Sequence, residues 1–347
     1  MNLQKMVVSR QRSFDYLKLF AIFLVIWGHC IQQMRVPNVE EDVAFRIIYS
    51  FHMPLFMMIS GYFSVSSLKM STRPFLMKKF RQLIYPIAVW GFMLWLYYEI
   101  PVFFNEQAKD LTFYGVLVDF YWMADFWFLK SCFICYCLVY LGSRLGIRHL
   151  YWVTGTLLIS QIISPFYVSI MYPCFVIGME LRLHSSVFKK MVSFYWVGLL
   201  IFFLMLCFWD VDAWNWSHGI PKGLLNEDIS VWCNVICCRI FRLVIGVIGA
   251  LAFIALFTKL LKNRDKGNRN LAEWGRYTLE IYILQSVILE SFLGKSGLIR
   301  FWNVNENMLD WIITPCCAIV LLVVCVKLIK MIYRSKFLGK MLFAKTI

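Results

Sequence analysis

The amino-acid sequence predicts an all-α, polytopic membrane protein with about ten transmembrane helices and both termini in the cytoplasm. Three observations support this fold class. The chain has 347 residues, of which 61% are hydrophobic and only 16% are charged, whereas about a quarter of the residues in a soluble domain are charged. Apolar runs of about 17–25 residues recur along the chain, and each is long enough to cross the hydrocarbon core of a bilayer. Lysines and arginines gather in alternate connecting segments.

The predicted spans fill most of the chain, so we expect a single integral membrane domain over residues 1–347. The first span is long and lacks a small-residue cleavage site, and we therefore expect it to stay in the protein rather than be removed as a signal peptide. The ten spans are predicted at residues 13–33, 44–66, 79–98, 126–142, 150–164, 166–181, 191–209, 230–258, 274–292 and 311–329.

The net charge of +15 is explained by membrane topology. Lysine and arginine are concentrated in the segments on one side of the predicted spans, and acidic residues such as Glu40, Glu41 and Asp42 on the other. Cytoplasmic loops carry the excess of Lys and Arg, which places both termini inside a cell membrane, as in the inner membrane of a bacterium. The basic balance therefore indicates a lipid bilayer as partner and no nucleic acid.

Two of the predicted outer segments are rich in aromatic residues. Residues 99–125 are aromatic and acidic, which is typical of a segment at the membrane interface. Residues 210–229 carry Trp214, Trp216 and His218. Tryptophan here either anchors the protein at the interface or stacks on a carbohydrate, and the sequence leaves both readings open.

The first predicted span carries ionisable residues along one face. Lys18 and His29 are eleven positions apart, with only apolar residues and glycine between them. At 100° per residue they lie about 20° apart around a helix and roughly 16 Å apart along it, and Asp15 lies within about 40° of His29. Ionisable groups at membrane depth usually face a protein interior or a water-filled cavity. We therefore predict that this stripe lines a cavity, with His29 in the outer half of the bilayer.

The second predicted span places His52 at a depth similar to that of His29. Pro54 removes a backbone hydrogen bond and bends the helix, and Ser60 and Gly61 let a neighbouring helix approach closely. Either the two histidines share a catalytic pocket, or His52 holds helices together through a hydrogen bond to a carbonyl oxygen.

The residue types present offer no metal site. Two histidines without a nearby carboxylate or thiolate make a poor zinc site. The twelve cysteines lie almost entirely within predicted spans, where a buried cysteine acts as a small hydrophobic residue. We expect neither a metal nor a disulfide framework.

A cluster of cations precedes the third predicted span, at Lys78, Lys79 and Arg81. These residues act as an orientation signal. Together with Lys18 at the inner end of the stripe, they also suit an anion, because clustered cations make charge-assisted hydrogen bonds to phosphate. The sequence leaves open whether they do more than orient the chain.

The fourth predicted span begins with Trp127 and Phe128 near the outer edge, and Lys130 lies a few residues further in. A lysine within the membrane needs a partner or water, unless its side chain extends outward to the interface.

Spans eight and nine carry further polar side chains. Arg239 and Arg242 are three residues apart and lie on neighbouring positions of one helix face. They either line the same cavity or pair with an acid elsewhere. Glu280 is a candidate partner for these buried cations, and Tyr282 and Gln285 follow it in the ninth span.

Taken in order, these segments resemble the motifs of the acyltransferase-3 family of integral membrane acyltransferases. The first-span motif of that family is an Asp, an Arg, ten residues and a His. This chain has Asp15, Lys18 and His29, with lysine in place of the usual arginine. The stretches FHMPLFMMISGYF, MKKFRQLIYP, FWFLKSCF, FVIGMEL and YTLEIYILQ resemble later motifs, the last of which commonly ends in His where this chain has Gln285. The resemblance runs over about residues 12–290.

The resemblance implies transfer of an acyl group, usually acetyl from acetyl-CoA, to a hydroxyl of a sugar in a cell-surface or lipid-linked glycan. Acyl-CoA would be a donor substrate and not a permanently bound cofactor. Its phosphates suit the basic inner face, with Asp15 orienting Lys18, and the glycan would enter from the outer half. His29 would act as general base or as a nucleophile that carries the acyl group. A transporter or flippase for a lipid-linked sugar and a non-enzymatic membrane regulator remain as alternatives.

Overall fold

The structure is a computed structural model that describes residues 12–35, 39–104, 126–162, 165–209, 228–261, 269–294, 297, 299 and 304–345. Within these residues the regular secondary structure is helical and contains no strand, which confirms the predicted all-α class. The connecting residues 210–227, with Trp214, Trp216 and His218, and the larger part of the segment 99–125 lie outside the described residues.

The helices follow the chain in an order close to the predicted one. The N-terminal half contains α1 (Arg12–Met34), η1 (Val39–Glu41), α2 (Val43–Leu68), α3 (Thr72–Lys79), η2 (Phe80–Ile84), α4 (Tyr85–Phe104), α6 (Trp127–Arg144), α7 (His149–Ile162), η3 (Pro165–Tyr167) and α8 (Val168–Leu183). The remainder contains α9 (Ser185–Ser193), α10 (Tyr195–Leu206), α12 (Ile229–Leu261), α13 (Arg269–Trp274), α14 (Thr278–Gln285), η6 (Ser286–Gly294), α15 (Glu306–Met308), η7 (Leu309–Ile313), α16 (Thr314–Arg334) and α17 (Lys336–Phe343).

Several of these helices are long and apolar enough to cross a membrane. Five qualify among the described residues, at Arg12–Met34, Val43–Leu68, Pro165–Leu183, Ile229–Leu261 and Glu306–Arg334. The pair α9 and α10 meets at a bend of 71° and makes a sixth if it counts as one span. The chain is therefore a multi-pass membrane protein. Helices also occupy the other predicted positions, but the total of ten spans and the cytoplasmic termini remain predictions.

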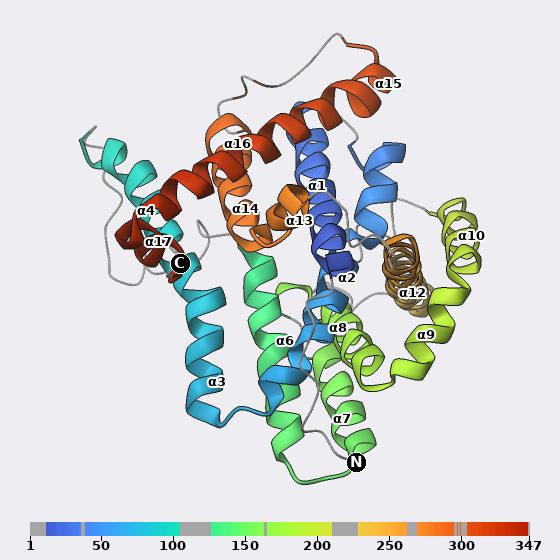
Figure 1. The fold of residues 1–347 in the computed structure, drawn as a ribbon. Helices are drawn as coiled ribbons and strands as arrows, with labels where there is room; N and C mark the ends of the chain where they lie inside the picture. Colours follow the sequence, from blue (N-terminus) through green and yellow to red (C-terminus); the bar gives the residue numbers. More distant parts are fainter. Residues whose placement is uncertain are drawn as a thin grey trace.

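Helices α1 and α2 lie at the centre of the bundle and carry much of its buried surface (Figure 1). Helices α8 and α12 pack against α2, and α16 runs obliquely across α1 and α14. The segment that ends in α17 returns to lie beside α4. Two helices that come early in the chain are thus packed against later ones.

Two glycines allow α2 and α8 to pack with their backbones in contact. A Cβ atom on Gly61 would lie 1.9 Å from the carbonyl oxygen of Phe175, and one on Gly178 would lie 2.0 Å from that of Met58. No side chain fits at either position, so each of the two helices has a glycine where the backbone of the other approaches it. Small residues at such crossings are a common way for membrane helices to approach closely.

Among the described residues, three segments adopt π-helix: η2, η6 and η7. A π-helix joins residues five apart instead of four and changes which side chains share a face, and it is frequent at functional sites. Two of these segments, η2 and η6, contribute to the candidate site.

Candidate active site

A cavity of about 160 Å³ lies along the predicted stripe of α1. Lys18, Ile22 and Val25 line it from that helix. His29 follows Val25 by four residues, so all four side chains fall on one helix face. Of the three ionisable residues of the stripe, Lys18 lines this cavity, whereas Asp15 and His29 are not among its lining residues. The other walls consist of Met53, Phe56, Ile59 and Ser60 from α2, Leu83 from η2, Phe128, Leu129 and Cys132 from α6, and Thr278, Leu279 and Tyr282 from α14.

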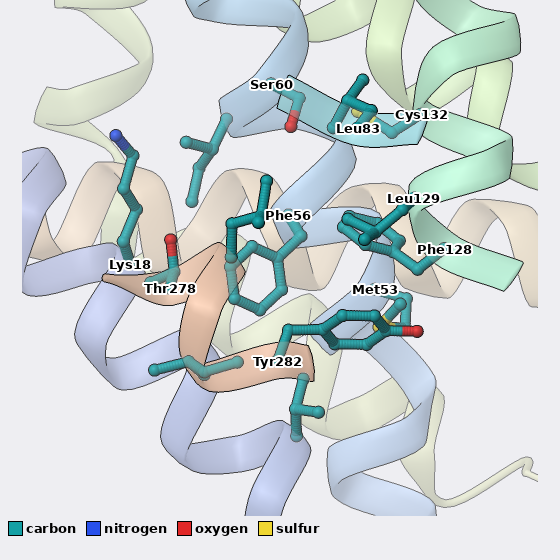
Figure 2. A pocket seen from close by; sticks show the side chains of 14 residues that line it. Lys18, Met53, Phe56, Ser60, Leu83, Phe128, Leu129, Cys132, Thr278 and Tyr282 are labelled. Atoms are coloured by element: carbon teal, nitrogen blue, oxygen red, sulfur yellow. The ribbon is translucent and has the colours of Figure 1, made fainter. Parts of the chain in front are cut away.

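The cavity is mostly apolar. Figure 2 shows Ser60, Leu83 and Cys132 together at one end, and Met53 and Tyr282 at the other. Apart from Lys18, no lining side chain carries a charge at neutral pH. Such a space suits a slender, uncharged chain better than a bulky polar group.

A second cavity, of about 330 Å³, adjoins the first. Ser60, Leu83, Cys132 and Leu279 line both, so the two spaces share a wall built from α2, η2, α6 and α14. The residues that line only the second cavity are Lys79, Arg81, Gln82, Tyr136, Phe343, Ala344 and Lys345. Three cations therefore line a space that lies next to the apolar cavity.

Lys79 is the buried cation of the second cavity. Its side chain is 5% exposed, and its Nζ atom lies 3.4 Å from the centroid of the Tyr136 ring. No carboxylate pairs with it among the described residues. A ring face stabilises a cation, but a buried ammonium group with no carboxylate nearby is costly unless another anion approaches it. The site thus favours an anionic ligand.

The other predicted cations divide between the cavities and the surface. Arg81 is exposed and lines the second cavity, and Lys18 lines the first, with its Nζ atom 4.6 Å from the centroid of the Phe63 ring. Lys78 is exposed and lines neither cavity. Lys78 therefore lies apart from the two cavities, because consecutive residues of a helix point about 100° apart and Lys79 is the one that faces inward.

Asp15 lies where α1 packs against the turn between α13 and α14. The residue is 8% exposed, and a Cβ atom on Gly275 would lie 1.9 Å from its carbonyl oxygen. The inner end of the stripe is thus held against the helix that supplies Thr278, Leu279 and Tyr282 to the cavity. The orienting role of Asp15 toward Lys18 stays a prediction.

At the other end of the stripe, His29 pairs with Glu290. The Nδ1 atom of His29 lies 3.2 Å from Oε1 of Glu290, and both side chains are partly exposed. Gln285 donates from Nε2 to the same carboxylate oxygen (3.5 Å) and to the carbonyl oxygen of Tyr282 (3.2 Å). Tyr282 lines the apolar cavity, and His29 lies one helical turn, roughly 6 Å, beyond Val25. A chain of polar contacts therefore links the end of the cavity to His29.

Glu290 favours one tautomer of a neutral His29. A carboxylate can only accept hydrogen bonds, so the contact is most favourable when Nδ1 carries the proton. In that tautomer the lone pair lies on Nε2, where it can accept a proton from a hydroxyl group. Two side chains placed in this way can supply a general base oriented by a carboxylate.

The sequence reasoning did not identify Glu290. Gln285 and Glu290 are five positions apart, which in an α-helix places them about 140° apart. The intervening chain is the π-helix η6, in which residues five apart share a side. The change from α- to π-helix brings the side chain of Gln285 to that of Glu290, which pairs with His29, and no periodicity based on 100° per residue reveals it.

His52 forms a hydrogen bond within its own helix. Its Nδ1 atom donates to the carbonyl oxygen of Ile48 at 2.8 Å, and the side chain is 2% exposed. The centroid of its ring lies 4.7 Å from that of Tyr49, whose hydroxyl group donates to Gln32 on α1 at 2.7 Å. His52 lines neither cavity. Tyr49 therefore makes the link between α1 and α2 at this point, and a catalytic role for His52 stays a prediction.

The arginines of α12 bind oxygen atoms that belong to no acid. Arg242 donates to the carbonyl oxygens of Ser50 (2.7 Å) and Tyr49. Ser50 is the residue whose helical partner would be the N–H of Pro54, an atom that proline lacks. Arg239 donates to the hydroxyl oxygen of Ser169 at 2.9 Å. Of the two readings that the sequence left open for Arg242, pairing with an acid and lining the cavity, the structure favours neither.

Glu280 has partners that the sequence reasoning did not propose. It is fully buried, accepts a hydrogen bond of 2.6 Å from Tyr333 and forms an ion pair with Lys345. Neither arginine of α12 forms an ion pair with it, nor does Lys130, whose Nζ atom lies 5.1 Å from the ring centroid of Phe166.

Trp127 and Phe128, the two aromatic residues shortly before Lys130, pack against different rings. The ring centroid of Trp127 lies 4.7 Å from that of Tyr167. Phe128 lies 5.8 Å from Tyr282, with which it lines the apolar cavity. Of the two residues, only Phe128 is part of the candidate site.

Comparison with known proteins identifies relatives along most of the chain. A family model described as an acyltransferase domain matches residues 11–330. The chain is similar to the nodulation protein NolL of Mesorhizobium japonicum, with 24% identity over 86% of this chain and 82% of that protein. It is also similar to the nodulation protein NolL of Sinorhizobium fredii, with 29% identity over 49% of this chain and 48% of that protein. No solved structure matches significantly.

The family match covers α1, with the stripe, and α14 and η6, with the partners of His29. It therefore includes both cavities except for the residues contributed by α17 and the short segment after it. The motifs noted in the sequence, the cavity along the first span and the extent of the match agree: the chain belongs to the acyltransferase-3 family and is a multi-pass membrane acyltransferase.

Proposed function

We propose that the chain transfers an acyl group, in the first instance acetyl, from cytoplasmic acyl-CoA to a hydroxyl of a sugar in a cell-surface or lipid-linked glycan. The observation that supports this most is the shared wall of the two cavities, which places a cation-lined space next to an apolar one on the helix face that carries His29. A donor with phosphates at one end and a slender arm at the other has this shape and charge distribution.

In this proposal the phosphates of the donor lie near Lys79 and Arg81, and the pantetheine arm enters the apolar cavity past Cys132. Lys18 contacts the arm from α1. Lysine has a point charge and no planar fork, so it makes a less directional contact than an arginine would at this place.

His29 is the proposed general base. Its Nε2 atom takes the proton of the sugar hydroxyl as the hydroxyl oxygen attacks the thioester carbonyl carbon, and the coenzyme leaves as its thiol. Glu290 orients the ring and stabilises the imidazolium that forms. General-base catalysis contributes about 10²–10⁴-fold. In an acyl-histidine route, the same Nε2 atom attacks the thioester first and the sugar hydroxyl then accepts the acyl group.

Family membership sets aside the transporter and the non-enzymatic alternatives. The proposal is tested by acyl transfer from radiolabelled acetyl-CoA in membranes of a host that supplies the native glycan pathway. Wild-type protein is compared at matched expression with His29→Ala and with His184→Ala, a control histidine on the exposed surface near α9.

We expect label in the glycan fraction with the wild type and with His184→Ala, and its loss with His29→Ala. Equal labelling by the wild type and by His29→Ala would remove His29 from catalysis. An absence of label with the wild type in that host would contradict the proposed donor or acceptor.

A further inference from the structure

The second cavity contains a cation that no family motif in the sequence includes. Lys345 lines this space together with Lys79 and Arg81, and it lies beyond the residues that the family model matches. We propose that Lys345 is a third phosphate-binding residue of the acyl-CoA donor, held at the cavity by Glu280 and Tyr333. This inference rests on the proposed function and extends it to the segment that follows α16.

The local structure directs Lys345 toward the cavity. Helix α17 is closely packed, since a Cβ atom on Gly339 would lie 2.8 Å from the ring of Tyr333, and Phe343 packs near Trp90 of α4. The chain then turns at Ala344, which has a φ of 51°. A left-handed conformation is unfavourable for alanine, so the contacts on either side of this residue must maintain it. The turn brings Lys345 back over the buried carboxylate of Glu280.

The ion pair fixes Lys345 but leaves it able to bind an anion. Glu280 is fully buried, whereas the side chain of Lys345 is 47% exposed. If Lys345 moved away, a buried carboxylate would be left without its counter-charge, which is strongly unfavourable. A lysine ammonium group has three hydrogen-bond donors, and the contact with Glu280 uses one of them. The others remain available on the cavity side.

The three cations differ in how they can act on a phosphate. Lys79 is buried against the ring of Tyr136, and Arg81 is exposed at the edge of the cavity. Lys345 is half-exposed and is held by its ion pair with the buried Glu280. They come from α3, η2 and the residue pair after α17, so only the folded chain brings them around one space. Clustered lysine and arginine bind phosphates through charge-assisted hydrogen bonds.

The test measures equilibrium binding of coenzyme A and of pantetheine, which lacks the phosphates, to the full chain in lipid nanodiscs. The variants are Lys345→Ala and, as a matched control on the exposed face of α17, Lys340→Ala. For Lys345→Ala we expect the Kd for coenzyme A to rise about tenfold, since a hydrogen bond to a charged group is lost. The Kd for pantetheine should not change, and Lys340→Ala should behave as the wild type for both ligands.

A second variant separates binding from folding. In Glu280→Gln/Lys345→Ala both charges are removed, so no buried carboxylate is stranded, and the same selective loss of coenzyme A binding is expected. Equal Kd values for coenzyme A in the wild type and in both variants would overturn the role of Lys345. Parallel weakening of coenzyme A and pantetheine would likewise overturn it and indicate a structural role. If the wild type itself does not bind coenzyme A, the proposed donor fails as well, and the two failures are thereby distinguished.

Discussion

Arg242 donates a hydrogen bond of 2.7 Å to the carbonyl oxygen of Ser50, from one membrane helix to another. That oxygen lacks its helical partner because Pro54 has no N–H. A Cβ atom on Gly246 would meet both Pro54 and Ser50, so α12 packs directly against α2 at the proline. The buried arginine thus satisfies backbone that a proline has released, close to His52 and one helix away from His29.

We expect Arg242→Ala to lower the free energy of unfolding less when Pro54 is also replaced by alanine. Alanine restores the N–H that bonds Ser50, and the coupling between the two sites should amount to about 1 kcal/mol. The measurement is a double-mutant cycle. Each of its four proteins is purified in detergent, and its free energy of unfolding is obtained from thermal unfolding. Arg239→Ala serves as the control on the same helix and should show no coupling to Pro54. An equal loss for Arg242→Ala in both backgrounds would contradict this role.

The partner of His29 gives a second prediction. Glu290→Gln keeps the size of the side chain but removes the charge that orients the ring, and we expect acyl transfer to fall about tenfold to a hundredfold. The activity of His29→Ala should fall further. The double variant Glu290→Gln/His29→Ala should be no less active than His29→Ala alone. Glu306→Gln, an exposed residue that pairs with Arg35, is the control. The measurement is the initial rate of acetyl transfer at matched expression. Unchanged activity for Glu290→Gln would show that Glu290 takes no part in the reaction.

The wall shared by the two cavities can be probed through its thiol. Cys132 lines both spaces, so a bound donor should cover it. We expect coenzyme A to slow alkylation of Cys132 by N-ethylmaleimide several-fold, as followed by mass spectrometry of the modified peptide. Cys207 is exposed on the outside of the bundle and should react at the same rate with and without coenzyme A. Equal protection of both thiols, or of neither, would argue against a donor path past Cys132.

Alanine substitutions at two glycines should have opposite effects on stability, because Gly178 lies at the crossing of α2 and α8 and Gly155 of α7 does not. Gly178→Ala places a methyl group 2.0 Å from a backbone oxygen, which only a separation of the helices can relieve, and we expect strong destabilisation. Gly155→Ala adds a methyl group where no atom lies within 4 Å, and helix propensity should make it neutral or stabilising by up to about 1 kcal/mol. Thermal unfolding of both variants in detergent tests the pair. Similar midpoints for the two would show that the helices do not approach as closely as described.

The parts of the site that the sequence predicts are those that depend on position within one α-helix. Lys18 and His29 share a face because their spacing suits 100° per residue, and the cavity lies along that face. The close approach at Gly61 is likewise a property of a single residue type. Helices also occur at each predicted span, since apolar runs of that length leave little other choice.

The rest depends on contacts between distant segments or on a change of helix type. Glu290 meets His29 only through the π-helix η6, and Lys345 meets Glu280 across 65 positions in the chain. The choice between Lys78 and Lys79 depends on which of two adjacent residues faces inward. Arg242 has carbonyl oxygens as partners, and every residue has a carbonyl, so composition gives no indication of them.

The π-helix η6 makes the active site sensitive to the length of the chain at one place. Substitutions between Gln285 and Glu290 that do not change the number of residues leave both of these side chains in place. Deleting a single residue there would let the segment close into an α-helix and would turn everything after it by about 100°, taking Glu290 away from His29. The residue count between these two side chains therefore matters more than the residues themselves. In related chains, a gap at this point would signal a different partner for the histidine.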